Sequence, residues 1–121
     1  MDVRGSAPGT MEIEVLKPVR LVPEINGLFL TGGSALGLAA VKGGHDFFSE
    51  KETGYNTGNA KIPIVPVAVI YDIGDKGKDA IPDSEMAYES AKNASDDQVP
   101  EGAFGIGTGA TVGNIYGPGK T

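Results

Sequence analysis

Short apolar runs separated by polar, glycine-rich stretches dominate the pattern of this chain. Residues 28–31 form an apolar run that ends at two glycines, and this pattern predicts a short buried strand. Residues 62–73 are rich in Val and Ile and predict a second strand. Because proline has no amide hydrogen to donate, the two prolines early in this run place the start of the regular strand at Val67.

Two helices are predicted beside these strands. Residues 35–41 are small or apolar nearly all round, which predicts a buried helix capped by the Ser34 hydroxyl and frayed at residues 43–44. Asp83 follows a proline and precedes small and apolar residues at helical spacing, so it should cap a helix that runs to about Ala94.

The remaining segments are polar or rich in glycine. Residues 11–16 alternate weakly and fit either a strand or a short helical turn, residues 49–61 are predicted to form a loop, and residues 74–81 a charged turn. Residues 102–113 contain five glycines. Glycine destabilises regular elements by roughly 0.5–1 kcal/mol relative to alanine, so this density predicts sharp turns or close backbone approach.

Length, charge and cysteine content limit the number of domains, the partners and the chemistry that the chain can have. Its 121 residues suit a single domain, residues 1–121, or a piece of one, and 40% of them are hydrophobic. The net charge of −6 argues against nucleic acid and anionic membranes as partners. With no cysteine, the chain has no thiolate nucleophile, disulfide or cysteine metal ligand. The sequence has neither a secretory signal pattern nor an apolar run of membrane length, so we expect a cytoplasmic location.

Ser34 is the first candidate for chemistry. The segment 32–37 nearly matches a nucleophile elbow, although its last glycine comes one position late. His45 is the one histidine and could serve as a base, but a catalytic triad also needs a third group to orient that base. The favoured alternatives are a helix cap for Ser34 and a solvated surface position for His45.

Three further patterns are weaker. Residues 105–110 superficially match a dinucleotide-binding turn, but the required helix and downstream acidic residue are not indicated. Asp72, Asp75 and Asp79 could suggest a cation site, yet their spacing fits no calcium loop, and a solvated turn is favoured. Tyr71 ends an apolar strand. Either its phenol projects into a cleft, or its ring packs in the core and its hydroxyl is exposed to solvent. We therefore expect neither a metal nor a cofactor.

Five segments, taken together, resemble the DmpA-like aminopeptidase/esterase family, which includes L-aminopeptidase/D-esterases, β-aminopeptidases and, more distantly, nylon-oligomer hydrolases. They occur in the family's order and span nearly the whole chain: residues 2–10, 30–40, 64–72, 82–83 and 105–113. The resemblance implies an α/β fold, in which this chain forms part of an α/β/β/α sandwich of the type found in N-terminal-nucleophile hydrolases.

The resemblance also implies a mechanism. Family members are made as a precursor that cleaves itself, and the new N-terminal Ser or Thr of the downstream subunit acts as nucleophile with its own α-amine as base. Tyr71 corresponds to a supporting catalytic position near the nucleophile and oxyanion, although many members carry Phe there. The implied substrate contacts come from two glycine-rich segments: Gly32, Gly33, Ser34, Gly107, Thr108 and Gly109.

By this resemblance, the chain corresponds to part of the upstream subunit, without the oxyanion asparagine or the nucleophile. Two function classes stay open. The first is a segment of an aminopeptidase/esterase that acts on N-terminal amino acids of small peptides, amides or esters, and that needs its downstream subunit, in a homo-oligomer. The second is a non-catalytic fragment or a module that binds a small molecule or protein.

Overall fold

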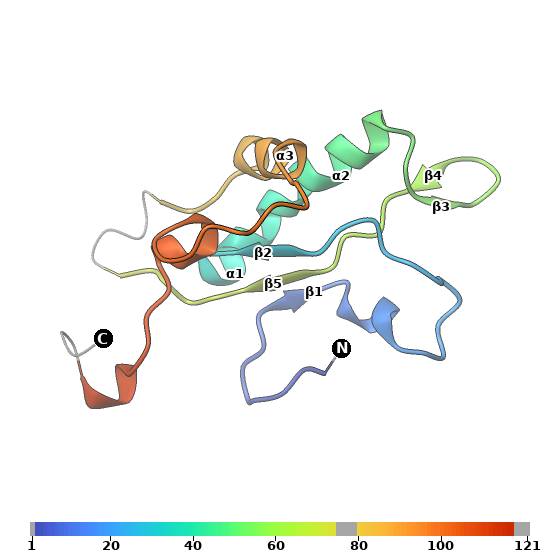
Figure 1. Cartoon of the computed structure of the whole chain (residues 1–121). Helices are drawn as coiled ribbons and strands as arrows, with labels where there is room; N and C mark the ends of the chain where they lie inside the picture. Colours follow the sequence, from blue (N-terminus) through green and yellow to red (C-terminus); the bar gives the residue numbers. More distant parts are fainter. Residues whose placement is uncertain (1, 75–79, 118–121) are drawn as a thin grey trace.

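A computed structural model of the chain describes residues 2–74 and 80–117 (Figure 1). Its main sheet has three short strands, β1 (Thr10–Met11), β2 (Phe29–Thr31) and β5 (Val67–Val69), in the order β1-β5-β2. The middle strand, β5, pairs antiparallel with β1 and parallel with β2. The strand that comes last in the sequence therefore lies at the centre of the sheet.

Helices cover one side of this sheet (Figure 1). The short helix α1 (Ser34–Gly37) and a 3-10 turn (Leu38–Ala40) lead directly into α2 (Val41–Glu50). A further helix, α3 (Ser84–Lys92), packs along α2. The core between helices and sheet consists of three buried valines with apolar neighbours around them: Val41, Val65 and Val67, and then Phe29, Leu38, Phe48 and Val69. The α/β class is thus confirmed.

The two predicted strands exist but are shorter or less buried than expected. β5 begins at Val67, as the prolines predicted, but ends at Val69 rather than continuing to residue 73. In β2, Phe29 packs against the core, whereas Leu30 points to the opposite side and is 52% exposed. The prediction of a buried strand is therefore wrong for Leu30, because the helices shield only one face of the described sheet.

The first predicted helix is more exposed and more regular than its sequence suggested. Several of its residues are exposed, so it is buried on one side only: Ala35, Leu36 and Ala39. It does not fray at the glycine pair 43–44, because α2 continues through both residues. A methyl group on Gly43 would overlap the carbonyl oxygen of Ser84. Gly43 therefore permits the close approach of α3 instead of ending the helix.

The second predicted helix is confirmed. Asp83 lies at the N-cap of α3, where its Oδ1 accepts a hydrogen bond from the Met86 amide at 2.9 Å. The expected loop 49–61 is partly wrong, because β3 (Tyr55–Asn56) and β4 (Lys61–Ile62) form a hairpin. For residues 11–16 both alternatives are realised, since β1 is followed by the 3-10 helix Ile13–Leu16.

The glycine-rich segment turns sharply, as its composition predicted. It contains the 3-10 helix Gly105–Thr108, and a second 3-10 helix, Asn114–Tyr116, follows it. Gly102, Gly105 and Gly113 all adopt positive φ angles, which glycine tolerates best. Of the predicted charged turn, residues 75–79 lie outside the described residues. Among the described helices, none has the length and apolar character needed to cross a membrane.

Candidate functional site

The ends of β2 and β5 form the starting point of the candidate site. Because these strands are parallel neighbours, their carboxyl ends lie at the same edge of the sheet, where α/β folds commonly bind ligands. The Ile70 amide donates to the Thr31 carbonyl, and the Ser34 amide donates to the Ile70 carbonyl, both at 3.0 Å. These two hydrogen bonds hold the turn after β2 against the chain that leaves β5.

Asp72 occupies the centre of this arrangement. Its Oδ1 accepts a half-buried hydrogen bond from the Gly33 amide at 2.7 Å. A methyl group on Gly32 would overlap Oδ2 of the same carboxylate, and so would a methyl group on Gly109. Three segments that are distant in sequence therefore meet around one side chain, and we call Gly32, Gly33, Asp72 and Gly109 the Asp72 junction.

The turn at this junction has an unusual backbone. Gly33 lies at the N-cap of α1 with φ 78° and ψ 10°, and Ser34 follows with φ 52°. A left-handed conformation at a non-glycine residue costs of order 1–3 kcal/mol and persists only where its surroundings enforce it. The prediction that Ser34 caps the helix is wrong, because Gly33 holds the cap position and no side chain caps this helix.

The other predicted site residues lie around the junction rather than within it. Tyr71 is 77% exposed, so its neighbour Asp72 is the residue that points into the junction. The Gly107 amide donates to the Phe104 carbonyl at 2.9 Å, which folds the glycine-rich segment upon itself. Thr108 is exposed beside Gly109. Of the predicted 107–109 group, Gly109 is the residue whose backbone packs against the Asp72 side chain.

His45 is not a freely solvated surface residue, contrary to the favoured sequence interpretation. Its Nε2 lies 3.8 Å from Glu12 Oε2, and the side chains of His45 and Glu12 are 34% and 32% exposed. The same Glu12 oxygen accepts a hydrogen bond from the Val65 amide at 3.0 Å. His45 is thus placed beside a carboxylate that binds the buried segment just before β5, and within the described residues no hydrogen bond joins it to Ser34.

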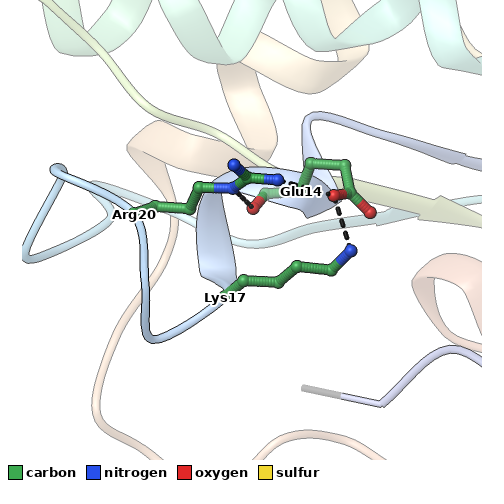
Figure 2. A network of polar contacts seen from close by, with 3 residues as sticks. All are labelled: Glu14, Lys17 and Arg20. Atoms are coloured by element: carbon green, nitrogen blue, oxygen red, sulfur yellow. Dashed lines mark hydrogen bonds and ion pairs between the residues drawn. The ribbon is translucent and has the colours of Figure 1, made fainter.

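Two polar groups away from the junction have shifted pKa values. Glu14 contacts Lys17 at 2.6 Å and Arg20 at 3.1 Å, and these hydrogen-bonded cations lower the pKa of its carboxyl (Figure 2). The Tyr88 phenol donates to Glu50 Oε2 at 2.6 Å, and this bond raises the pKa of Tyr88. Both contacts are exposed and tie neighbouring segments together rather than forming a reactive centre.

Asp72 is the residue that sequence reasoning missed. The sequence grouped it with Asp75 and Asp79 in a solvated turn, and the latter two lie outside the described residues. The available signal was its position near the end of the Val- and Ile-rich run, in a chain whose other apolar run is followed by two glycines. Within residues 2–74 and 80–117, no group of three His, Cys, Asp or Glu side chains is arranged to hold a metal ion.

A known protein family matches nearly the whole chain. The family described as peptidase family S58 matches residues 1–119. An uncharacterized aminopeptidase of Mycobacterium tuberculosis is 38% identical over 117 residues, and one of Mycobacterium leprae is 36% identical over 124 residues. These alignments cover 97% of this chain and 34% of each relative, so the chain spans about a third of their length.

A more distant relative is named for a different activity. A 6-aminohexanoate-oligomer endohydrolase of Paenarthrobacter ureafaciens is 30% identical over 90 residues. That alignment covers 74% of this chain and 25% of the relative. The mycobacterial relatives are thus named as aminopeptidases and this one as an endohydrolase, and the Asp72 junction lies within the region that the family matches.

Proposed function

Because this chain belongs to peptidase family S58, we propose that it is the upstream segment of a self-processing, N-terminal-nucleophile aminopeptidase/esterase. Its substrates are small peptides, amides or esters that carry a removable N-terminal amino acid. The family consists of peptidases. The aminopeptidase names of the mycobacterial relatives support removal of residues from the N-terminus of the substrate.

The Asp72 junction is the single observation that carries this proposal. It brings three of the family-like segments to the carboxyl ends of two parallel strands, the position at which α/β folds form catalytic clefts. The missing side chains of Gly32 and Gly109 leave room for the Asp72 carboxylate, so these segments pack closely at this edge of the sheet. We propose that this surface, with Ser34, Gly107 and Thr108 at its border, forms one wall of the substrate site.

The proposed nucleophile is the N-terminal Ser or Thr of a downstream subunit, activated by its own α-amine. This chemistry requires neither cysteine nor a histidine base, which suits a chain that has no cysteine and holds its one histidine beside Glu12. The exposed phenol of Tyr71, at the border of the junction, is proposed to donate to the oxyanion. In this proposal the complete enzyme is a homo-oligomer of an α/β/β/α sandwich.

A mass spectrum of the native gene product tests self-processing directly. We expect two subunits, of which one contains this sequence and the other begins with Ser or Thr. The purified product should hydrolyse p-nitroanilides of small D- or L-amino acids or of β-alanine. An uncleaved product without turnover of any of these anilides contradicts the proposal. Turnover that depends on Ser34 would instead indicate a local serine site.

A non-catalytic binding module is the second candidate. It is favoured by the large apolar side chains that remain exposed next to the junction, such as Leu30, Leu36 and Phe104, which are 52%, 60% and 59% exposed. Detection of a single native product of 121 residues, without amidase or esterase activity, would support this alternative over the hydrolase.

A further inference from the structure

We propose that Asp72 is a positioning residue, whose carboxylate clamps the Gly32–Ser34 turn and the Gly109 backbone into one rigid wall of the site. This inference rests on the proposed hydrolase function for its catalytic consequence. Its structural part stands on the contacts of Asp72 alone, so the two parts are tested by different measurements.

The hydrogen bond between Asp72 and Gly33 is the main contact of the clamp. It is 2.7 Å long, charge-assisted and half-buried, and it joins residues that are 39 positions apart. The Gly33 amide lies at the start of α1, where no side chain caps the helix. Asp72, three residues beyond β5, therefore anchors the residue at the N-cap position from a distant part of the chain.

The two glycines that face this carboxylate, Gly32 and Gly109, leave room for it because they carry no Cβ atom. A methyl group at Gly32 or at Gly109 would overlap Oδ2, and the short Asp72 side chain cannot swing aside without losing its bond to Gly33. The two glycines are thus required by the carboxylate, and the carboxylate holds the two glycine segments together.

The backbone conformation of Ser34 also depends on the clamp. Its left-handed φ of 52° is unfavourable for serine, so the turn needs external restraint to keep it. That restraint comes from two sides, because the Ser34 amide donates to Ile70 and the preceding amide donates to Asp72. Without the carboxylate, we expect the turn to relax and the Gly109 segment to move away.

Amide hydrogen exchange, resolved to single residues by mass spectrometry on the intact gene product, tests the clamp. In Asp72→Ala, exchange of the Gly33 amide should accelerate about tenfold, the size expected for loss of a hydrogen bond to a charged group. Asp72→Asn keeps an acceptor oxygen and should retain most of the protection. Unchanged exchange at Gly33 in Asp72→Ala overturns the clamp.

The chain contains a matched control in Asp83, which accepts the Met86 amide at the start of α3. Asp83→Ala should accelerate exchange at Met86 and leave Gly33 unchanged, and Asp72→Ala should do the reverse. Equal acceleration at both amides in Asp72→Ala indicates general loosening and contradicts a local clamp.

Gly109→Ala provides a second route that keeps the carboxylate but displaces it. We expect faster exchange at Gly33 in this variant, and no further acceleration when it is combined with Asp72→Ala. Gly74→Ala is the control, because a methyl group there meets nothing within 4 Å. If Gly109→Ala leaves Gly33 protected, the proposed contact between the two segments is wrong, even where Asp72→Ala does not fold.

Kinetics then test the catalytic consequence. In an active gene product, Asp72→Ala should lower kcat on an amino-acid p-nitroanilide by about tenfold or more with little change in KM, as expected when geometry needed in the transition state is lost. Asp72→Asn should restore most of kcat. Normal kcat in a variant with an unprotected Gly33 overturns the positioning role, whereas an inactive wild type contradicts the hydrolase proposal and leaves the exchange result standing.

Discussion

At the scale of single residues, Gly33 and Ser34 depend on a side chain that comes far later in the sequence. The left-handed conformation of Ser34 would be costly in isolation, and the Asp72 carboxylate and the Ile70 carbonyl hold the Gly33 and Ser34 amides in place. Tyr71, next to Asp72, keeps its side chain largely exposed. The segment just beyond β5 therefore presents one half-buried anchor and one accessible phenol.

This exposure makes Tyr71→Phe a sharp test in the complete enzyme. The substitution removes only the hydroxyl group, so the melting temperature should hardly change. Loss of one oxyanion donor typically lowers kcat by about 10²–10³-fold, or roughly 2.7–4 kcal/mol. Steady-state kinetics with an anilide substrate measure this effect. Tyr116→Phe, at a residue that is 69% exposed, is the control, and an unaltered kcat/KM in Tyr71→Phe would leave Tyr71 without a catalytic role.

The Tyr88 phenol should titrate above its ordinary pKa of 10.0, because it donates to Glu50. A raised pKa in the folded state means that the stabilising effect is complete below the unfolded value and is lost as pH rises through the folded value. Absorbance of the phenolate, compared between wild type and Tyr88→Phe, identifies this group. Glu50→Gln should bring the transition back toward 10.0, whereas Glu85→Gln should not.

Sequence reasoning worked at this scale where a residue acts on its near neighbours. Asp83 was predicted as a cap because its acceptor and the Met86 amide lie within one helical turn. Asp72 was missed and Ser34 was misassigned for the same reason: the bond to Gly33 spans 39 residues, and no local pattern encodes that pairing. The catalytic role of Tyr71 stays a prediction.

At the scale of elements, glycine has different structural roles at α1 and α2. Before α1 it permits a left-handed turn, and inside α2 it permits contact between helices. The sequence pattern predicted a break at residues 43–44, because glycine is a poor helix former. The break does not occur, because the close packing of α3 at Gly43 favours a residue without a side chain.

The glycine pair in α2 offers a matched comparison. Gly43→Ala places a methyl group against the Ser84 carbonyl and close to the Tyr88 amide, so it should destabilise the fold by about 1–3 kcal/mol, as overpacking does. Gly44→Ala meets its nearest neighbour, Val65, at an ordinary 3.7 Å and should be neutral or slightly stabilising. Urea unfolding measures both, and equal effects would refute the packing role of Gly43.

Strand existence and start were predictable, but strand length and exposure were not. The prolines before Val67 fix where ladder bonds can begin, which is a local chemical property. Where β5 ends, Ile70 bonds instead to Thr31 of β2 and Ser34 of α1, which are distant in sequence and invisible to the local pattern. The exposure of Leu30 depends on the sheet having helices on one described face, which its own sequence does not reveal.

At the scale of the whole molecule, the face of the sheet away from the helices is apolar and open. Leu28 and Leu30 are each 52% exposed there, along β2 at the edge of the sheet. An α/β class was predictable from the family-like segments, whereas the proposed sandwich requires a further layer on this open face. The relatives are about three times longer than this chain, which is consistent with additional structure against it.

Association of the isolated 121-residue chain is therefore expected. Exposed apolar edges pair with other chains when nothing covers them, so the average mass measured by sedimentation should rise with concentration. Leu30→Lys should reduce this association more than Leu36→Lys, because Leu36 lies on α1 rather than on the sheet. A monomer with a sharp, concentration-independent thermal transition would contradict the expectation.

The strand order also has a consequence for the growing chain on the ribosome. Within the described sheet, β1 and β2 are synthesised before β5, and β5 is the strand with which each of them pairs. Until Val67–Val69 is released, two nascent segments carry unsatisfied backbone groups and exposed apolar side chains. The final strand then inserts between them and completes both ladders together. The junction around Asp72, three residues beyond that strand, also includes Gly109, so it is complete only after the glycine-rich segment has been synthesised.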